Sequence, residues 1–201
     1  MIAILDYGMG NLRSVEKAFG YIGINAIVTN EKRHLMDARA IIIPGVGAFY
    51  NAIENLKEKG LIDSIINEVN KGKPLLGICL GMQILFQRGS ETEACNGLGL
   101  LEGDVIKIPP KFKIPHMGWN KLHRRQDSRL LQGLEEDEYV YFVHSFYVKT
   151  DANDIVKGVT QYGVEIPAVI EKDNVFAMQF HPEKSGDIGL KILRNFGQVI
   201  K

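Results

Sequence analysis

The first half of the chain alternates between short apolar runs and segments that carry the period of an α-helix. Residues 2–6 read IAILD, which is apolar and too short for a helix, and residues 74–79 form another such run. Between them, Leu12, Val15 and Phe19 recur at intervals of three and four residues, which places them on one face of a helix. Short buried strands that alternate with amphipathic helices predict a parallel sheet covered by helices on both faces. The elements expected here are strands at residues 2–6, 26–29, 40–43 and 74–79 and helices at 11–22, 52–58, 61–71 and 80–87.

The second half of the chain predicts mainly β structure. Short β-prone runs are separated there by Gly, Pro and Asn, and one amphipathic segment, 184–199, ends the chain. The strands expected here are 104–108, 139–143, 146–150, 155–161, 167–171 and 175–180. We therefore predict a three-layer, flavodoxin-like α/β fold with a central, mostly parallel (mixed) sheet and extra antiparallel strands in the C-terminal half. Residues 1–201 show no internal repeat or linker, so one domain is expected.

Composition excludes several classes of protein. Lys plus Arg and Asp plus Glu are both 24, so the chain has no bulk charge with which to bind nucleic acid. Two cysteines cannot form a disulfide framework, and they favour a reducing compartment. The longest uncharged runs, 40–53 and 74–87, contain Pro and Gly and are too short for a membrane span. The N-terminus lacks the basic start of a signal peptide, and we expect a cytoplasmic protein.

The strongest chemical signal is GICLG at residues 77–81, which leaves a predicted strand and enters a predicted helix. A nucleophile with glycine two residues to either side has the spacing of a nucleophile elbow, and the nucleophile here is Cys79. Because the turn is sharp, a side chain at Gly77 or Gly81 is expected to collide with a neighbouring strand or helix. The turn places the sulfur at the carboxyl edge of the sheet and at a helix N-terminus, which favours thiolate. The alternative is a buried cysteine that acts as a small apolar side chain, the interpretation we prefer for Cys95.

His181 is the candidate proton carrier among five histidines. It follows the predicted strand 175–180 in the sequence QFHPE, and in an extended chain residues 181 and 183 point to the same side. Glu183 can then orient the ring and stabilise its protonated form, as the acid of a catalytic triad does. Pro182 stiffens the pair. The alternative is a lone histidine at a strand end beside an exposed glutamate.

Attack on a carbonyl carbon also requires hydrogen-bond donors for the oxyanion. The backbone N–H of Leu80, directly after the nucleophile, is one expected donor. A second can come from PGVG at residues 44–47, where Gly45 and Gly47 let the backbone approach a substrate closely. The alternative for this segment is a tight turn from strand to helix.

Two further segments allow other interpretations. DYGMGNLR at residues 6–13 begins like a dinucleotide-binding fingerprint, and Glu31 lies near the end of the second strand, but Arg13 stands where the third glycine is needed. Residues 107–129 are rich in Lys and Arg, yet an acidic run follows at 135–138, so a locally balanced, solvated surface is preferred. No Cys/His cluster has zinc spacing and no P-loop is present, so neither metal nor cofactor is expected.

These motifs together resemble a known family. GICLGMQ at 77–83 and QFHPEKS at 179–185 are similar to the triad-type (class I) glutamine amidotransferases, and the resemblance covers essentially the whole chain. Four more motifs are similar to those of the glutaminase subunits of imidazole glycerol phosphate synthase, an enzyme of histidine biosynthesis. They are DYGMGN at 6–11, PGVGAF at 44–49, PHMGWN at 115–120 and YFVHSFY at 141–147. Many amidotransferases share the triad signature, whereas the four further motifs are far more selective.

The resemblance implies a class I amidotransferase architecture and a mechanism. Cys79 would attack the side-chain amide carbon of L-glutamine, His181 would carry a proton to the leaving ammonia, and Glu183 would orient His181. Water would then hydrolyse a γ-glutamyl thioester. The residues expected to bind the substrate, with the oxyanion segments included, are Gly47, Leu80, Gln83, His144, Ser145 and Phe146. Spacing independently supports Gln83, which lies four residues beyond Cys79 on the following helix.

The resemblance also implies a partner. In the family a cyclase subunit, a (β/α)8 barrel, docks over the glutaminase in a heterodimer and receives ammonia through a channel. It makes imidazole glycerol phosphate and an aminoimidazole carboxamide ribotide. The positions that match the contact are Asn11, Trp119, Tyr141 and Lys184, although residue type alone leaves Trp119 and Tyr141 open to core packing. In the family the glutaminase is largely silent alone, and the PGVG strand is thought to present its oxyanion donor only when the partner is loaded.

Three other functions stay open on the sequence. The chain could serve a different amidotransferase, such as the one of anthranilate or pyridoxal phosphate synthesis, although DYGMGN and MGWN favour the cyclase. It could be a stand-alone cysteine hydrolase on a related fold, which predicts strong activity of the isolated chain on other substrates. It could also be a non-catalytic nucleotide-binding module that uses Gly8 and Gly10, which predicts that Cys79 is dispensable.

Overall fold

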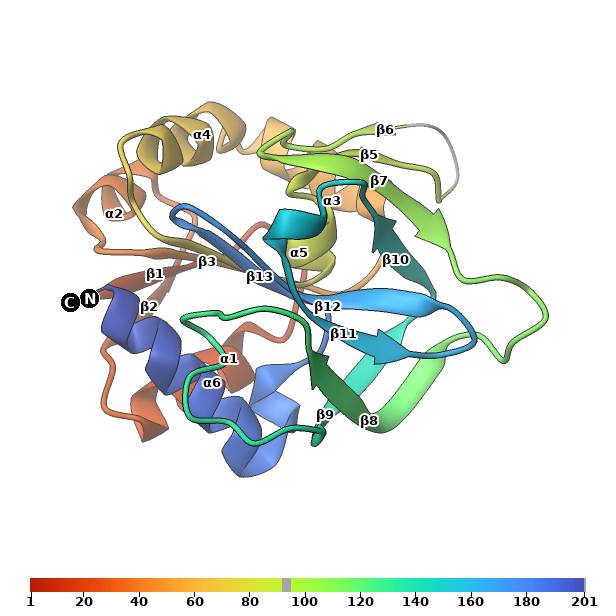
Figure 1. The fold of residues 1–201 in the computed structure, drawn as a ribbon. Coiled ribbons are helices and arrows are strands. Elements are labelled where there is room, and N and C mark those ends of the chain that lie inside the picture. Colours follow the sequence, from red (N-terminus) through yellow and green to blue (C-terminus); the bar gives the residue numbers. More distant parts are fainter. Residues whose placement is uncertain (92–94, 201) are drawn as a thin grey trace.

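The structure is a computed structural model that describes residues 1–91 and 95–200. Strands and helices alternate through the first 83 residues, and strands dominate from there to the last helix (Figure 1). The first half contains β1 (Ile2–Leu5), α1 (Leu12–Tyr21), β2 (Ala26–Thr29), α2 (Lys32–Asp37), β3 (Ile41–Gly45), α3 (Phe49–Glu58), α4 (Ile62–Asn70), β4 (Leu75–Cys79), α5 (Leu80–Gln83), β5 (Phe86–Gly89) and β6 (Cys95–Asn96). The second half contains β7 (Leu101–Lys107), β8 (His116–Arg124), β9 (Glu138–His144), β10 (Phe146–Lys149), η1 (Asn153–Ile155), β11 (Val156–Gln161), β12 (Glu165–Lys172), β13 (Val175–Met178), η2 (Pro182–Lys184) and α6 (Gly186–Val199), where η marks a 3₁₀ helix.

Nine strands form the central sheet, in the order β2-β1-β3-β4-β13-β12-β11-β8-β9. The first five run parallel, and β12, β11, β8 and β9 continue the sheet antiparallel. A second sheet has the order β10-β7-β5-β6. The predicted fold class, a mostly parallel sheet extended by antiparallel strands from the C-terminal half, is confirmed. The decisive placement is that of β13, which lies between β4 and β12, so the end of a late strand meets the end of β4.

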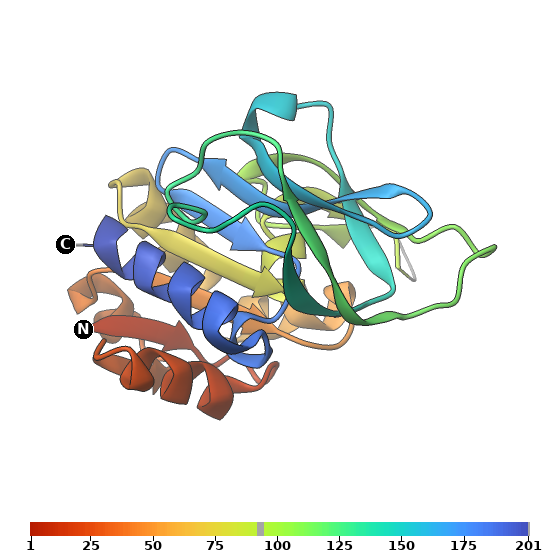
Figure 2. The ribbon, with the colours of Figure 1, turned by 60° about the horizontal axis from the view of Figure 1, so that its bottom comes forward.

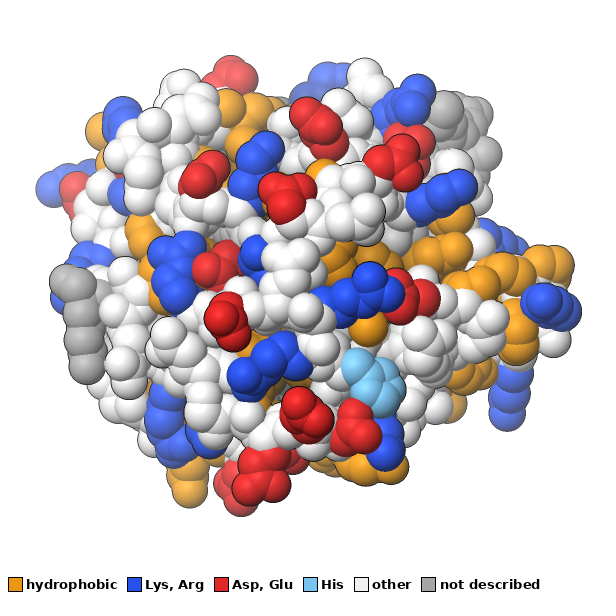
Figure 3. Space-filling model, viewed as in Figure 1, with side chains coloured by type: hydrophobic (Ala, Val, Ile, Leu, Met, Phe, Trp, Pro, Cys, Tyr) orange, Lys and Arg blue, Asp and Glu red, His pale blue; other side chains and the backbone are white. Residues whose placement is uncertain are grey.

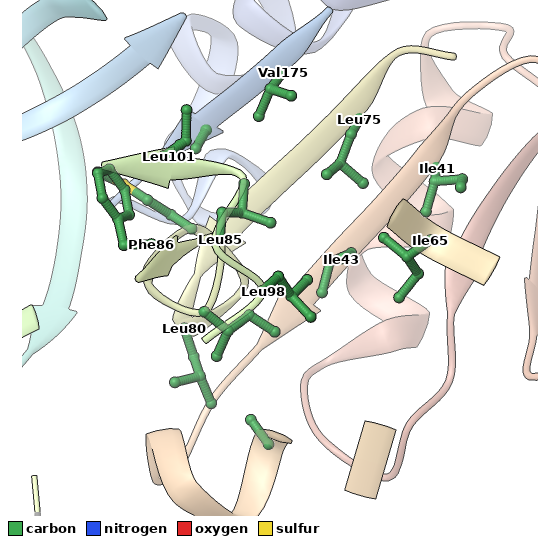
Figure 4. Packing of buried hydrophobic residues seen from close by; sticks show 14 of the residues in the cluster. Ile41, Ile43, Ile65, Leu75, Leu80, Leu85, Phe86, Leu98, Leu101 and Val175 are labelled. Atoms are coloured by element: carbon green, nitrogen blue, oxygen red, sulfur yellow. The ribbon is translucent and has the colours of Figure 1, made fainter. Parts of the chain in front are cut away.

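Two apolar cores lie on opposite faces of the central sheet because side chains alternate along each strand. Ile2 and Ile4 face α1 and α6, whereas Ala3 and Leu5 face the side of α2, α3, α4 and the second sheet (Figures 1 and 2). Figure 4 shows part of this second core, where Ile41, Ile43 and Leu75 of the sheet pack with residues such as Ile65, Phe86 and Leu101. The two cores complete the three layers.

The surface carries interspersed charges, as the acidic run after residues 107–129 predicts. Figure 3 shows Lys and Arg next to Asp and Glu over one face. Lys121 and His123 both contact Asp137, and Arg129 contacts Glu171. Within residues 1–91 and 95–200, none of the helices combines the length and apolar character that a bilayer crossing requires.

Several elements differ from the expectation, among them strands β5 and β6, which were not predicted. The helix expected at 80–87 ends at Gln83, because Phe86 pairs with Leu101 in the second sheet. Strand β8 was not expected, because its residues are mostly polar or basic and only two, His116 and Leu122, are buried. Helix α2 was missed as well, because only Leu35 of its six residues is buried and one buried position gives no period.

Candidate active site

Cys79 lies at a sharp turn between β4 and α5, as the glycine spacing predicts. Its backbone has φ 56° and ψ −111°, a conformation that L-residues rarely adopt. A Cβ at position 81 would lie 1.7 Å from the carbonyl oxygen of Ile43 in the neighbouring strand, and one at position 77 would lie 2.6 Å from the oxygen of Gly81. Both glycines are therefore required sterically, and the predicted elbow geometry is confirmed.

The register of β13 on β4 brings His181 to the same sheet edge as Cys79. Met178 pairs with Ile78, so the chain that follows β13 passes beside the turn. His181 Nδ1 lies 2.8 Å from Glu183 Oε1, and their side chains are only 3% and 2% exposed. The predicted pair is present, but not through an extended chain: Pro182–Lys184 forms one turn of 3₁₀ helix, which brings residue 183 back toward the ring.

The backbone of this segment is held to β9 independently of Glu183. The N–H of His181 donates to the carbonyl of Tyr141 at 2.9 Å. The buried hydroxyl of Ser185 donates to the carbonyl of His181 at 2.6 Å and accepts from the N–H of Tyr141 at 3.0 Å. The position of His181 is thus fixed by main-chain bonds, and Glu183 acts on the ring alone.

The electrostatics favour a protonated His181. Burial lowers its pKa, but the interactions with Cys79 and Glu183 outweigh burial and raise it to about 10. Its Nε2 is buried and has no hydrogen-bond partner among the described residues, while the Cys79 thiol points to the carbonyl of Val143 at 3.8 Å. Catalytic contacts commonly tighten only when substrate binds. Since α5 is a single turn, the help from a helix N-terminus that the sequence suggested is small.

A cavity of about 310 Å³ opens at the sulfur. All six residues expected to bind substrate line it together with Cys79, whereas His181 and Glu183 lie buried outside the lining. The lining consists of Val46, Gly47, Cys79, Leu80, Gln83, Glu91, Pro115, Val143, His144, Ser145 and Phe146. Segments from four distant parts of the sequence thus meet around one small space.

Two polar residues of this site were not expected from the sequence. Gln179 is fully buried; its Nε2 donates to Cys79 Sγ at 3.7 Å, and its Oε1 accepts from Gln83 Nε2 at 3.0 Å. Glu91 contributes a carboxylate to the cavity, and its Oε2 accepts from the N–H of Phe49 at 2.7 Å. Gln179 stands two residues before His181 in the QFHPE sequence, and this closeness could have indicated it as a site residue. No local sequence pattern indicates Glu91.

The PGVG segment runs along the cavity at the end of β3. Gly45 pairs with Cys79 in the sheet, and Gly47 has φ 104°. The buried Tyr7 hydroxyl donates to the carbonyl of Pro44 at 2.7 Å, and a Cβ at Gly10 would lie 3.3 Å from the nitrogen of Gly45. The loop that resembles the start of a dinucleotide-binding fingerprint therefore packs against this segment, and this contact explains why a glycine is needed at position 10.

The four residues expected at a partner contact lie on the surface or near it. Trp119 is 56% exposed and meets the partly buried Tyr141 edge-on, with ring centroids 6.1 Å apart. Lys184 Nζ lies 5.8 Å from the centre of the Tyr141 ring. Asn11, at the start of α1, is exposed as well. Met117 and Tyr139 add further exposed apolar surface to the β8–β9 hairpin.

Comparison with known proteins places the chain in a family. The model of the class-I glutamine amidotransferases matches residues 3–199. Imidazole glycerol phosphate synthase subunit HisH of Caldanaerobacter subterraneus subsp. tengcongensis is 53% identical over 201 residues, which cover 100% of this chain and 99% of that protein. The protein of the same name from Desulfitobacterium hafniense is 52% identical over 200 residues, with 100% and 95% coverage.

Solved structures agree on the fold. A glutamine amidotransferase crystal structure superimposes with a TM-score of 0.79 at 22% identity and covers 99% of this chain and 98% of that one. The structure of PurLQS from Thermotoga maritima gives 0.76 at 23% identity, with 100% and 98% coverage. The chain therefore belongs to the class-I glutamine amidotransferase family, within the group of imidazole glycerol phosphate synthase HisH subunits.

Proposed function

We propose that this chain is the glutaminase subunit of imidazole glycerol phosphate synthase and that it hydrolyses L-glutamine at Cys79. The observation that carries the proposal is the position of the sulfur. It sits on a strained turn at the base of a cavity of about 310 Å³, and a buried imidazole and carboxylate lie behind it. A strained nucleophile beside such a pair is suited to covalent catalysis.

The reaction proceeds in two halves. The Cys79 thiolate attacks the amide carbon of glutamine, and protonated His181 delivers its proton to the departing nitrogen, so ammonia leaves and a γ-glutamyl thioester remains. Water then attacks the thioester while His181 accepts its proton, which releases glutamate and restores the thiol. The oxyanion of each step is stabilised by the N–H groups of Leu80 and the Gly47 segment, since donors placed in advance contribute strongly in a water-poor site.

The polar lining supports glutamine as the substrate. Glu91 supplies the carboxylate that an α-ammonium group requires, and it lies at the wall of the cavity. Both N–H bonds of the Gln83 amide are occupied by Phe146 and Gln179, which leaves its oxygen to accept from the substrate amide. The backbone of His144, Ser145 and Phe146 also lines the cavity and is suited to bind the carboxylate end.

The released ammonia passes to a cyclase subunit that docks on the β8–β9 hairpin, over the cavity. Contiguous exposed apolar patches are uncommon on a surface that stays in water, and this hairpin presents Met117, Trp119 and Tyr139 on one face. Tyr141 and Lys184 lie beside Trp119, and together with Asn11 they form the proposed contact. We propose a (β/α)8 barrel as this partner, in a heterodimer in the cytoplasm, where reducing conditions keep Cys79 as a free thiol.

Glutamate release from glutamine tests the function. The chain alone, and the chain with the cyclase subunit and its ribotide ligand, are assayed with the wild type and with Cys79→Ala. We expect the variant complex to form normally and to lose activity by at least about 1,000-fold, as removal of a nucleophile does.

Cys95→Ala is the matched control, because it removes the other thiol, which lies outside the cavity lining. It is expected to behave as wild type. Normal glutamate release by Cys79→Ala would refute the assignment of the nucleophile, and a cyclase subunit that fails to bind the wild-type chain would refute the assignment of the partner.

A further inference from the structure

A chain of hydrogen bonds leads from strand β8 into the wall of the cavity through two histidines. His116 and His144 lie opposite each other in the β8–β9 ladder, with Nδ1 of His116 and Nε2 of His144 3.0 Å apart. On the cavity side, His144 Nδ1 lies 2.9 Å from the carbonyl oxygen of Phe146. On the far side, His116 Nε2 lies 3.2 Å from Asn120 Nδ2.

Only one arrangement of protons on neutral rings satisfies every bond. The carbonyl of Phe146 can only accept, so His144 carries its hydrogen on Nδ1 and its Nε2 is an acceptor. His116 Nδ1 must then donate, which makes His116 Nε2 the acceptor of the Asn120 amide. The Asn120 amide is oriented to donate, because its oxygen accepts from the N–H of Lys121 at 2.8 Å and its nitrogen also donates to the carbonyl of Gln161 at 3.0 Å.

The surroundings keep both rings neutral and fixed. His116 is 3% exposed and stacks between Tyr162, with centroids 4.0 Å apart, and Phe142, with centroids 4.9 Å apart. Burial lowers the pKa of His116 to about 4. Burial likewise lowers the pKa of His144, to about 3. The hydrogen bond to Phe146 raises this pKa, but the nearby His116 and His181 lower it further. Neither ring is therefore charged near neutral pH.

The last acceptor of this chain belongs to the cavity. The Phe146 carbonyl also accepts from Gln83 Nε2 at 2.9 Å, so His144 and Gln83 share one backbone oxygen at the wall. We propose that His116 is a positioning residue for glutamine binding: its Nδ1–H donates to His144 Nε2 and fixes the His144 ring against the Phe146 carbonyl, and it thereby holds the 143–146 wall and Gln83 in place. This inference rests on the function proposed above, because it assigns a role within the same glutamine site.

Loss of the His116 donor has a definite consequence. Without it, the buried Nε2 of His144 is an acceptor that has lost its donor, and such a group is costly to leave unpaired. The ring is expected to turn toward another donor or toward water, and its Nδ1–H then leaves the Phe146 carbonyl. The wall shifts as a result, which weakens glutamine binding before it affects the sulfur.

Two substitutions separate hydrogen bonding from packing. His116→Phe retains a ring between Tyr162 and Phe142 but removes both nitrogens. His116→Asn loses the stacked ring but places an amide N–H where Nδ1 was, so the donor to His144 is kept. Both variants are assayed in the complex with the cyclase subunit and its ribotide ligand, with KM for glutamine and kcat measured separately.

The proposal predicts that His116→Phe raises KM by about tenfold, as expected when a buried polar partner is lost. In the same variant kcat changes by less than about threefold, and His116→Asn stays within about threefold of the wild-type KM. The reverse order, with His116→Asn the more damaged variant, would mean that His116 only packs and would overturn the proposal.

The proton arrangement can be measured without any activity. Nitrogen NMR of wild-type complex with labelled histidine should show His144 protonated on Nδ1 at pH 7 with a hydrogen-bonded Nε2, and His116→Phe should remove the hydrogen-bond shift of that Nε2 signal. A wild-type His144 protonated on Nε2 would overturn the proposal even if both variants failed to fold. If instead the wild-type complex released no glutamate while His144 showed the Nδ1 form, the proposed function would fail and the hydrogen-bond chain would stand.

Discussion

At the scale of single residues, the groups that fix the position of His181 differ from the groups that set its protonation state. The Tyr141 carbonyl and the Ser185 hydroxyl bind the backbone of His181 and place it, whereas Cys79 and Glu183 raise the pKa of its ring. The pair His116 and His144 shows the same division of roles: stacking on Tyr162 places the His116 ring, and hydrogen bonds select one tautomer. Residues that fix the position of a histidine and residues that set its protonation state can therefore be tested separately by substitution.

Glu183→Ala is expected to lower kcat less than His181→Ala does. The ring of His181 keeps its backbone anchors when Glu183 is removed, whereas removal of the ring eliminates the proton carrier, a loss of roughly 10²- to 10⁴-fold. Steady-state glutamate release in the cyclase complex measures both. Equal or reversed losses would indicate that Glu183 does more than orient the ring.

Acid is expected to destabilise the protein through the neutral histidine pair. His116 titrates near 6.5 when unfolded and at about 4 when folded, so the unfolded state binds the extra proton between these values. Stability is therefore retained above pH 6.5 and falls as the pH drops toward 4. Between pH 7 and 4.5, the free energy of unfolding should fall by on the order of 2 kcal/mol less in His116→Phe than in the wild type. Urea unfolding at both pH values measures the difference, and parallel curves would contradict it.

At the scale of elements, the elbow depends on close contact between β4, α5 and β3. Gly81 faces the backbone of Ile43, where no flexible side chain can move aside. Gly45 is similarly confined, since a Cβ there would lie 2.5 Å from the Tyr7 hydroxyl and 2.9 Å from Leu80 Cβ. The strained Cys79 backbone persists because these neighbouring elements leave it no other arrangement.

Gly81→Ala is expected to destabilise the protein by at least about 3 kcal/mol or to prevent folding, as severe core overpacking does. Gly20→Ala is the control. Gly20 is an exposed residue of α1 with no heavy atom within 4 Å of an added Cβ. Alanine there should stabilise the helix by about 0.5–1 kcal/mol. Thermal and urea unfolding of both variants test this, and a Gly81→Ala variant as stable as wild type would contradict the packing argument.

At the scale of the whole molecule, one hairpin joins the proposed docking face to the cavity. Side chains alternate along β8 and β9, so Trp119 and Tyr141 lie on one face while His116 and His144 lie on the other. The same two strands thus carry the proposed docking surface on one side and the cavity wall on the other. A shift of the hairpin on docking would therefore also move the wall of the glutamine site.

Trp119→Ala is expected to weaken binding of the cyclase subunit by about 2 kcal/mol, or roughly 30-fold in Kd, because large aromatic side chains dominate interface energies. Tyr21→Ala is the matched control: Tyr21 is more exposed, at 76%, and lies at the end of α1 away from the hairpin. It should bind the cyclase as wild type does. Isothermal titration calorimetry measures both, and an unchanged Kd for Trp119→Ala would remove this face from the interface.

Local patterns in the sequence predicted those elements and residues whose cause is local. The strands β1, β3 and β4 are fully buried on both faces, so they appear as continuous apolar runs. Cys79 was found from the spacing of its glycines, because the elbow is built within a few residues. His181 and Glu183 were paired on the expectation of an extended chain, whereas a 3₁₀ turn brings them together. Strand β8 gave no such signal, because its pairing with β9, not its composition, makes it a strand.

The sequence by itself determined the class of fold and singled out Cys79, His181 and Glu183 as candidate catalytic residues, since periodicity and steric limits act between neighbours along the chain. Only the tertiary structure decided that β13 lies beside β4 and that residues 47, 91, 144 and 179 surround one sulfur. Strand order reflects the burial of whole faces and not a local preference, and Gln179 reaches Cys79 across 100 positions of sequence. For the same reason the His116–His144 chain was invisible in the sequence: its members are paired by register alone.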